Sequence, residues 1–320
     1  MDVSGYAAKP DAYDTLSAYQ IAKFFNEHGL VRDEVDHFAA NLLGSPVSAT
    51  PVQGASSYTV SGDEAAQVVQ FRRSRLPMRQ IEVAIQIYGD FVPECKSQGM
   101  FGPVHVYLAD LVPGPAFCRV RNQFFSPTPT MEQRLQQTVQ DFARFFASAW
   151  ISKTAHTVEP PHGLLDEYSQ ILYEVSLDLP AQLQAKLDDV HQELPRLFRS
   201  SYPMVLQHDD LLEHNIHVDE ATGHITGIVD WADAKIAPFG VSLANMEVVL
   251  GIQTRTNWHF QPNHNRLREL FWKAFYQATG YISKDDRRSI EVARLFGLFR
   301  EYGLEEKEHA IAYLSALCLL

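Results

Sequence analysis

The polar residues between Gln207 and Trp231 have the types and spacing that phosphoryl transfer requires. Asp210, Asn215 and Asp230 surround a predicted strand, turn and strand, which would bring both carboxylates to one edge. One carboxylate can orient an attacking hydroxyl and accept its proton. A second carboxylate and an amide oxygen can hold Mg²⁺ against the phosphates of a nucleotide. Asp210 is therefore the predicted base, and Asn215 and Asp230 are the predicted metal ligands.

Short elements are expected to position these residues. Residues 216–218 and 225–229 are predicted strands, and the turn between them centres on residues 219–223. Acidic residues and Asn are common in turns, where their side chains bond nearby backbone, so such a cluster can also be purely structural. The joint occurrence of loop, Asn, hairpin and Asp-Trp favours the catalytic interpretation.

Neighbouring histidines suggest other metal chemistry. His214, His217 and His224 could form a zinc site, but no cysteine lies near them and two of them would alternate along strands. Solvated or packed histidines are the favoured interpretation. His208 and Asp209 together also occur in metal phosphohydrolases of the His-Asp type, which are helical throughout. The β-branched hairpin predicted after this loop argues against that class.

The order and spacing resemble the aminoglycoside phosphotransferase and choline kinase group, a branch of the protein-kinase-like fold. His208, Asp210 and Asn215 match its catalytic loop of His, any residue, Asp, four residues and Asn. Residues 229–231, Val-Asp-Trp, match its Ile-Asp-Trp segment. The resemblance implies that Asp210 is the catalytic base and that Asn215 and Asp230 bind Mg²⁺. His208 is grouped with the catalytic residues, although we expect it to brace the loop rather than transfer a proton.

The same resemblance implies an α+β, bilobal protein-kinase-like fold with a small antiparallel β lobe and a larger, mainly helical lobe. It also implies ATP and Mg²⁺ as cofactors and a hydroxyl of a small molecule as the acceptor. We expect residues 1–50 to form a helical extension, residues 51–114 the nucleotide-binding lobe and hinge, and residues 115–320 the helical lobe.

The predicted nucleotide-binding residues depart from the family pattern at two places. The candidate phosphate-covering loop contains one glycine, Gly54, and two serines, Ser56 and Ser57, which could supply donors in place of further glycines. The usual Lys of the third strand is replaced by Arg72 at the end of the predicted strand 67–72, which keeps the charge but changes its geometry. A solvated strand end is the structural alternative for Arg72.

Two further predictions complete the nucleotide site. Glu82, on a predicted helix over residues 78–88, is the expected partner of Arg72, with Glu94 as the second candidate. Residues 104–108 form a predicted strand that leads into the hinge, where the backbone of Asp110 and Val112 would meet adenine.

The remaining pattern is mostly helical. Helices are predicted at 15–27 and 34–43 in the extension, and a loop around Gly99 and Gly102 is predicted between the helix 78–88 and the strand 104–108. Leu135 to Trp150 recur at helical spacing, and Ser283 with Asp286 resembles a capping box. The aromatic segment 258–260 is predicted as a loop. Further helices are predicted at 165–175, 181–198, 242–250, 266–279, 287–300 and 305–319.

Composition indicates a soluble enzyme. The chain has 320 residues, of which 46% are hydrophobic, and a net charge of −12, which is opposite to the basic face that nucleic acid requires. Its three cysteines lie far apart, which favours a reducing compartment. The beginning lacks a signal-peptide pattern, and no window approaches the ~20 apolar residues that span a bilayer. We expect a cytoplasmic protein with no nucleic-acid or membrane partner; the oligomeric state is left open.

The acceptor is a small molecule whose identity the pattern leaves open. The segment after Trp231 resembles fungal members of the family, whose substrates are diverse. Two alternatives to a kinase remain: a catalytically silent module that binds a nucleotide or metabolite, and a kinase scaffold used for other natural-product chemistry. The sparse glycine loop and Arg72 suggest the first, whereas the intact Asp210, Asn215 and Asp230 set favours the enzyme.

Overall fold

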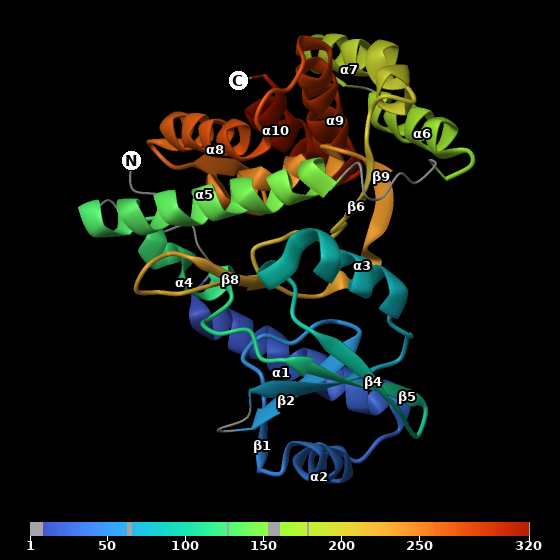
Figure 1. The fold of residues 1–320 in the computed structure, drawn as a ribbon, viewed down its shortest axis with the longest axis vertical. Coiled ribbons are helices and arrows are strands. Elements are labelled where there is room, and N and C mark those ends of the chain that lie inside the picture. The colour runs from blue at the N-terminus through green and yellow to red at the C-terminus, as the bar shows by residue number, and fades with distance from the viewer. Residues whose placement is uncertain (1–8, 63–65, 127, 153–160, 178, 320) are drawn as a thin grey trace.

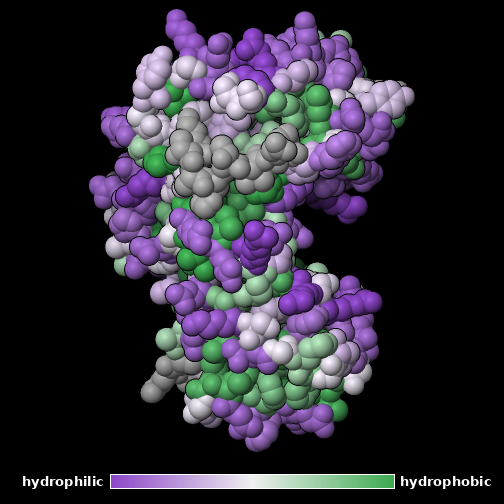
Figure 2. Space-filling view, turned by 45° about the vertical axis from the view of Figure 1, so that its right-hand side comes forward, coloured by the Kyte–Doolittle hydropathy of each residue, from purple (hydrophilic) through white to green (hydrophobic). Residues whose placement is uncertain are grey.

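The computed structural model describes residues 9–62, 66–126, 128–152, 161–177 and 179–319. The chain forms a small lobe built on an antiparallel sheet and a larger helical lobe, with the hydrophobic residues divided between two separate clusters (Figure 1). This is the expected α+β, bilobal kinase-like arrangement. The molecular surface is hollowed between the lobes (Figure 2).

The sheet of the small lobe has five antiparallel strands in the order β1-β2-β3-β5-β4. The strands predicted at residues 67–72 and 104–108 are confirmed. The buried residues of β2 and β3 alternate along each strand, which is the pattern of a sheet packed on one face. The strands span Val47–Ala49 (β1), Ser57–Gly62 (β2), Gln67–Arg72 (β3), Cys95–Phe101 (β4) and Val104–Asp110 (β5).

The loop predicted around Gly99 and Gly102 is wrong in its first part, because Gly99 lies within the edge strand β4. A register shift occurs between Ser97 and Gly99, and Gly99 has φ +90°, which a residue without a Cβ adopts readily. Most side chains of β4 are exposed. The strand therefore lacks the apolar alternation by which strands are predicted.

Helices α1 (Pro10–His28) and α2 (Arg32–Leu43) pack on this sheet. Phe24 of α1 and Val35 of α2 belong to the same buried cluster as Tyr58 and Phe71 of the strands. Gly29, with φ +61°, ends α1 in the left-handed conformation. Helix α2 and the later turns of α1 therefore pack on the small lobe.

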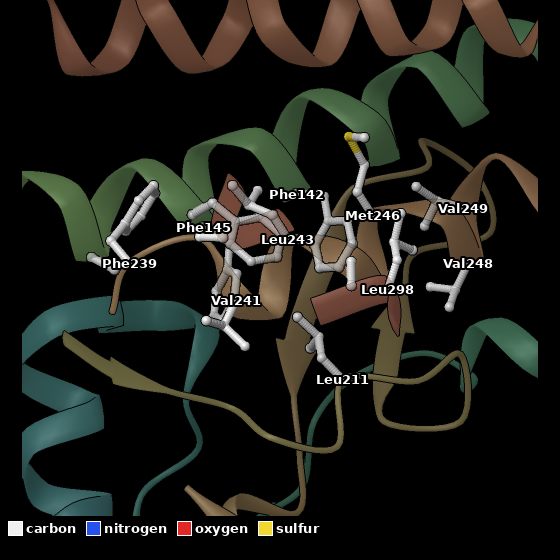
Figure 3. Packing of buried hydrophobic residues seen from close by; sticks show 14 of the residues in the cluster. Phe142, Phe145, Leu211, Phe239, Val241, Leu243, Met246, Val248, Val249 and Leu298 are labelled. Atoms are coloured by element: carbon white, nitrogen blue, oxygen red, sulfur yellow. The ribbon is translucent and has the colours of Figure 1, made fainter. Parts of the chain in front are cut away.

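Helix α5 forms the centre of the large lobe. Its Phe142 and Phe145 face the segment that carries Leu243 and Met246, and Leu298 of α9 closes the cluster from the other side (Figure 3). Thr128 caps α5 and Ser283 caps α9, the latter as predicted. The helices are Met78–Tyr88 (α3), Phe117–Phe124 (α4), Pro129–Ile151 (α5), Leu164–Ser176 (α6), Ala181–Glu193 (α7), His264–Thr279 (α8), Lys284–Tyr302 (α9) and Lys307–Cys318 (α10).

Three two-stranded sheets lie among these helices. β6 (Met204–Gln207) pairs with β9 (Lys235–Pro238), and β7 (Ile216–Val218) pairs with β8 (Ile225–Ile228), as predicted for the hairpin. The segment 258–260, predicted as a loop, is strand β11 (Trp258–Phe260), which pairs with β10 (Gly251–Gln253). Trp258 is buried against Tyr302 and fills the lobe. The helix predicted at 242–250 is a run of 3₁₀ turns, Val241–Val249.

No helix within the described residues is long and apolar enough to cross a membrane. Cys95, Cys118 and Cys318 are free thiols.

Candidate active site

The catalytic loop begins at the end of β6, where His208 is held on both sides. His208 is 1% exposed, its Nε2 donates to the carbonyl of Val229 at 2.8 Å, and its Nδ1 accepts from the amide of Asp210 at 3.2 Å. Burial lowers the pKa of His208, which keeps the ring neutral with its proton on Nε2. Both nitrogens are occupied by backbone, so the geometry is that of a brace.

Asn215 holds the predicted base. Its Nδ2 donates to the Asp210 carbonyl at 2.7 Å and to the Asp210 carboxylate at 3.1 Å, and Asn215 is buried. The amide oxygen takes no part in these contacts, which leaves it available to a cation. The backbone carbonyl of Asn215 accepts from the Val229 amide at 2.9 Å. These bonds join the catalytic loop to the segment that carries Asp230.

Asp230 follows β8 in an unusual conformation. Among the described residues it is the one non-glycine with positive φ, at 60°. Such a conformation costs free energy and clusters at functional sites. Trp231 is buried behind it, with its Nε1 donating to Ile228 at 2.8 Å and its ring packed on His208. The carboxylate of Asp230 is therefore fixed by packing rather than by propensity.

Arg72 lies at the point where the small lobe meets Asp230. Its side chain is 6% exposed, and Nη1 contacts the Asp230 carboxylate at 3.0 Å. Nη2 donates to the hydroxyl of Ser56 at 3.3 Å, and Nη1 also approaches Gln70 at 3.4 Å. The structure thus brings together Ser56 of the predicted phosphate-covering loop, the predicted phosphate-binding residue Arg72 and the predicted metal ligand Asp230.

Glu82 is not part of this group. The apolar face of α3, including Ile81, Ala84 and Ile87, packs into the cluster of the large lobe, which turns Glu82 to solvent. Within the described chain, Glu82 makes no ion pair, and the second candidate, Glu94, contacts Lys96 instead. The carboxylate partner of Arg72 is Asp230.

Gly54, Ser56 and Ser57 occupy the turn into β2. Gly54 and Ser56 are exposed, whereas Ser57 is buried as the first residue of the strand. A Cβ on Gly54 would lie 3.2 Å from the Ser57 hydroxyl, so the loop is tightly folded at that point. Only Ser56 reaches Arg72 in this arrangement.

The hinge follows β5. The amide of Asp110 donates to the Glu94 carbonyl, and the amide of Glu94 donates to the Asp110 carboxylate. The amide of Val112 has no hydrogen-bond partner among the described residues. Gly114 has φ +80°, and a Cβ there would lie 2.2 Å from the carbonyl of Val218. The hinge therefore passes directly over the β7–β8 hairpin that leads to Asp230.

The charge state of Asp210 depends on a neighbouring histidine for which no role in phosphoryl transfer was predicted. His214 lies 3.8 Å from the Asp210 carboxylate. The pKa of Asp210 is lowered, chiefly by the neighbouring His214. Burial lowers the pKa of His214, but the interaction with Asp210 outweighs this and the net shift is upward. Asp210 is therefore ionised at neutral pH.

Asp209, between His208 and Asp210, has an anchoring role in the structure. Its carboxylate contacts Lys235 at 2.6 Å and Arg300 at 2.8 Å. Burial and the nearby carboxylates Asp209 and Asp210 raise the pKa of Glu301, partly offset by Arg300. Glu301 therefore belongs to the surroundings of the base.

The three histidines considered for zinc have separate partners. His217 contacts the Gly114 carbonyl at 2.9 Å, His224 contacts Asp141 at 2.8 Å, and His214 faces Asp210. No group of three or more His, Cys, Asp or Glu side chains suited to a metal occurs within the described residues.

Comparison with solved structures places this arrangement among kinase-like folds. The chain is 14% identical to macrolide 2'-phosphotransferase MphH from Brachybacterium faecium, covering 89% of this chain and 97% of that one, with a TM-score of 0.54. A choline/ethanolamine kinase family protein from Mesorhizobium loti gives 12% identity, coverage of 89% and 94%, and a TM-score of 0.56. Amicoumacin kinase in complex with AMP-PNP and Ca²⁺ gives 13%, coverage of 81% and 80%, and a TM-score of 0.50.

The sequence gives the family directly. No curated protein matches the chain. The model of the phosphotransferase enzyme family matches residues 100–261, a span that begins in the edge strand of the small lobe and includes the hinge, the catalytic loop and the Asp-Trp segment. That span is just over half of the 320 residues. With both the fold and the loop in agreement, the chain belongs to the phosphotransferase enzyme family.

Proposed function

We propose that this enzyme transfers the γ-phosphoryl group of ATP to a hydroxyl of a small molecule, with Mg²⁺ bound to the nucleotide. The observation that carries the proposal is the contact between lobes: Arg72 of the small lobe, which donates to Ser56, also contacts Asp230 of the large lobe, where Asn215 holds Asp210. A nucleotide laid between the lobes would meet cationic, metal-binding and base groups together.

The residues present fit Mg²⁺. Asp230 and Asn215 offer a carboxylate and an amide oxygen, and Mg²⁺ is commonly bound by one or two such protein oxygens with phosphates and water completing its shell. When bound, Mg²⁺ would neutralise charge on the phosphates. The Asp230 carboxylate is one-third exposed, so it remains accessible while Arg72 holds it from the other side.

The chain's own groups supply positioning and the base. Asp210 would accept the proton of the acceptor hydroxyl as that oxygen attacks, and its lowered pKa keeps it ionised for this task. Arg72 would contact the phosphates, since guanidinium groups bind them bidentately. His208 would keep the loop in register through Val229.

Adenine is the base favoured by the hinge. The unused amide of Val112 lies where a purine ring could accept a hydrogen bond, and Asp110 precedes it at the end of β5. The AMP-PNP in the complex of amicoumacin kinase supports a nucleotide of this kind. We further propose that residues 51–114 form the nucleotide-binding lobe and hinge and that residues 115–320 form the helical lobe. We also propose that the enzyme acts on a small molecule in the cytoplasm and is related to fungal members of the family.

A screen of hydroxylated metabolites with ATP and Mg²⁺, followed by mass spectrometry, tests the proposal. An acceptor that gains the mass of one phosphoryl group, together with ADP release that requires Mg²⁺, is the expected result. Nucleotide binding without any ADP release, with or without acceptors, would instead favour a silent binding module.

A further inference from the structure

Helix α1 places a buried hydroxyl at the root of the loop 53–57. Ser17 is 6% exposed, and its Oγ donates to the Pro51 carbonyl at 3.0 Å while accepting from the Gln53 amide at 3.1 Å. Gln53 directly precedes Gly54, and Pro51 lies three positions before it. Ser17 therefore fixes the point from which the loop departs.

Gln53 carries this anchor across to the other side of the loop. Its side chain accepts from the Thr59 amide at 3.0 Å and donates to the Thr59 carbonyl at 2.7 Å and the Thr50 carbonyl at 3.0 Å. Ser56, within the loop, accepts from Arg72. A displacement of residues 51–53 would therefore also displace Ser56 and the guanidinium of Arg72.

The first turns of α1 lie on the other lobe. Asp14 forms an ion pair with Arg119 of α4 at 2.6 Å. Tyr13 lies near Cys118, Arg121 and Glu213: burial raises the pKa of Tyr13 to about 12, Arg121 acts to lower it, and Cys118 and Glu213 act to raise it. Figure 1 shows the start of α1 close to α4 and its remaining turns across the sheet.

Helix α4 is in turn fastened to the catalytic loop. The Cys118 amide donates to the Glu213 carbonyl at 2.9 Å, and Arg121 contacts the Glu213 carboxylate at 3.1 Å from a buried position. Glu213 lies between Asp210 and Asn215 in the sequence. One helix therefore touches the loop 53–57 directly and the catalytic loop through α4.

We infer that Ser17 is a positioning residue for the nucleotide, and that α1 holds the loop 53–57 in a fixed relation to the catalytic loop. The inference rests on the proposed function, because the loop affects catalysis only if it covers a nucleotide. Ser17 acts through Pro51 and Gln53 and makes no contact with the reacting atoms.

Ser17→Ala tests the first part. We expect the KM for ATP to rise roughly threefold to tenfold, the effect of losing buried hydrogen bonds, with kcat within about twofold. Ser148→Ala, which removes a hydroxyl bonded to its own helix on α5, is the matched control and should leave both constants unchanged. An unchanged KM for ATP in Ser17→Ala would overturn the assignment.

Asp14→Arg tests the connection between lobes by placing two cations together. We expect the KM for ATP to rise about twofold to fivefold, as for a surface pair turned repulsive, and to recover in the Asp14→Arg, Arg119→Asp double variant. Glu27→Arg makes the same reversal at an exposed pair with Lys23 on the same helix and should have no effect. Equal kinetics for Asp14→Arg and wild type would refute the connection.

Amide hydrogen exchange separates this inference from the proposed function. In the nucleotide-free protein, exchange over residues 53–57 should be faster in Ser17→Ala than in wild type, whether or not any acceptor is found. If the wild-type protein shows no phosphotransfer but exchange over residues 53–57 is faster in Ser17→Ala, the proposed function is wrong and the anchoring of the loop by Ser17 is retained. If exchange over residues 53–57 is the same in both proteins, the anchoring by Ser17 is wrong.

Discussion

The guanidinium of Arg72 lies 3.0 Å from the carboxylate of Asp230, which joins two residues separated by 158 positions. Arg72 ends β3 in the small lobe, and Asp230 follows β8 in the large lobe. The pair neutralises a buried cation and holds the carboxylate that we propose as a Mg²⁺ ligand against the guanidinium that we propose as the phosphate-binding group. It therefore fixes the relation between these two proposed parts of the site.

Replacing Arg72 tests its role as the phosphate clamp. Arg72→Lys should keep a good part of the activity, whereas Arg72→Met should lose roughly tenfold to hundredfold in ATP affinity or rate, since hydrogen bonds to charged groups contribute about 1.5 to 3 kcal/mol. Titration with ATP and steady-state rates measure this. Arg73→Met removes the adjacent, exposed arginine and should be neutral. Parent-like behaviour of Arg72→Met would place the clamp elsewhere.

Asp230→Asn should weaken the Mg²⁺-dependent part of ATP binding. An anionic oxygen contributes more than an amide oxygen to binding a hard cation, so the affinity should fall while Mg²⁺-free binding changes less. ATP titrations with and without Mg²⁺ provide the comparison. Asp233→Asn makes the same change at an exposed neighbour and serves as the control. Equal Mg²⁺ dependence in Asp230→Asn and wild type would show that the metal binds at another site.

Gly114→Ala should destabilise the protein because the hinge passes over the hairpin. Its φ of +80° costs ~1–2 kcal/mol for an L residue, and the added Cβ would also lie 2.2 Å from the Val218 carbonyl. Gly99→Ala shares the positive φ but meets open space, so it should lose only the first of these amounts. Denaturant unfolding of both variants measures the two losses in the free energy of unfolding. Equal losses would mean that the hinge moves away from Val218 without destabilising the protein.

His208 should make stability fall on acidification. Burial lowers its folded pKa below the unfolded value of about 6.5, so the unfolded chain takes up a proton that the folded chain does not. As pH falls below ~6.5 toward the folded pKa, the free energy of unfolding should drop by up to ~1.4 kcal/mol per pH unit.

The variant His208→Asn isolates this contribution, since other titrating groups are common to both proteins. It should be less stable at neutral pH, through lost contacts to Val229 and Asp210, but its free energy of unfolding should depend less steeply on pH. Denaturant melts at a series of pH values between about 7.5 and 5 give the two slopes. Equal slopes of the free energy of unfolding against pH in the two proteins would mean that the pKa of His208 is the same in the folded and unfolded states.

The catalytic segment could be predicted because its signals are local. Asp210, Asn215 and the hairpin before Asp230 lie within one short stretch, so spacing and alternation were sufficient to predict strands β7 and β8. The edge strand β4 escaped prediction because its exposed side chains do not alternate and Gly99 imitates a turn. The chemical roles of these residues stay predictions.

Contacts between distant segments could not be predicted in the same way. The partner of Arg72 depends on which face of α3 is buried, and packing of Ile81 and Ala84 directs Glu82 away from the sheet. The anchoring of the loop by Ser17 likewise depends on α1 lying across both lobes. Neither relation has a sequence signal, because each joins residues far apart in the chain.

Phosphoryl transfer by wild type and by Asp210→Ala, measured as Mg²⁺-dependent ADP release and phosphorylated acceptor, tests the central claim most directly. We expect Asp210→Ala to retain its fold and ATP affinity while turnover falls by a factor of about 100 or more, as for loss of a positioned base. Asp188→Ala, at an exposed site on α7, should turn over like wild type. Wild-type turnover in Asp210→Ala would contradict the account.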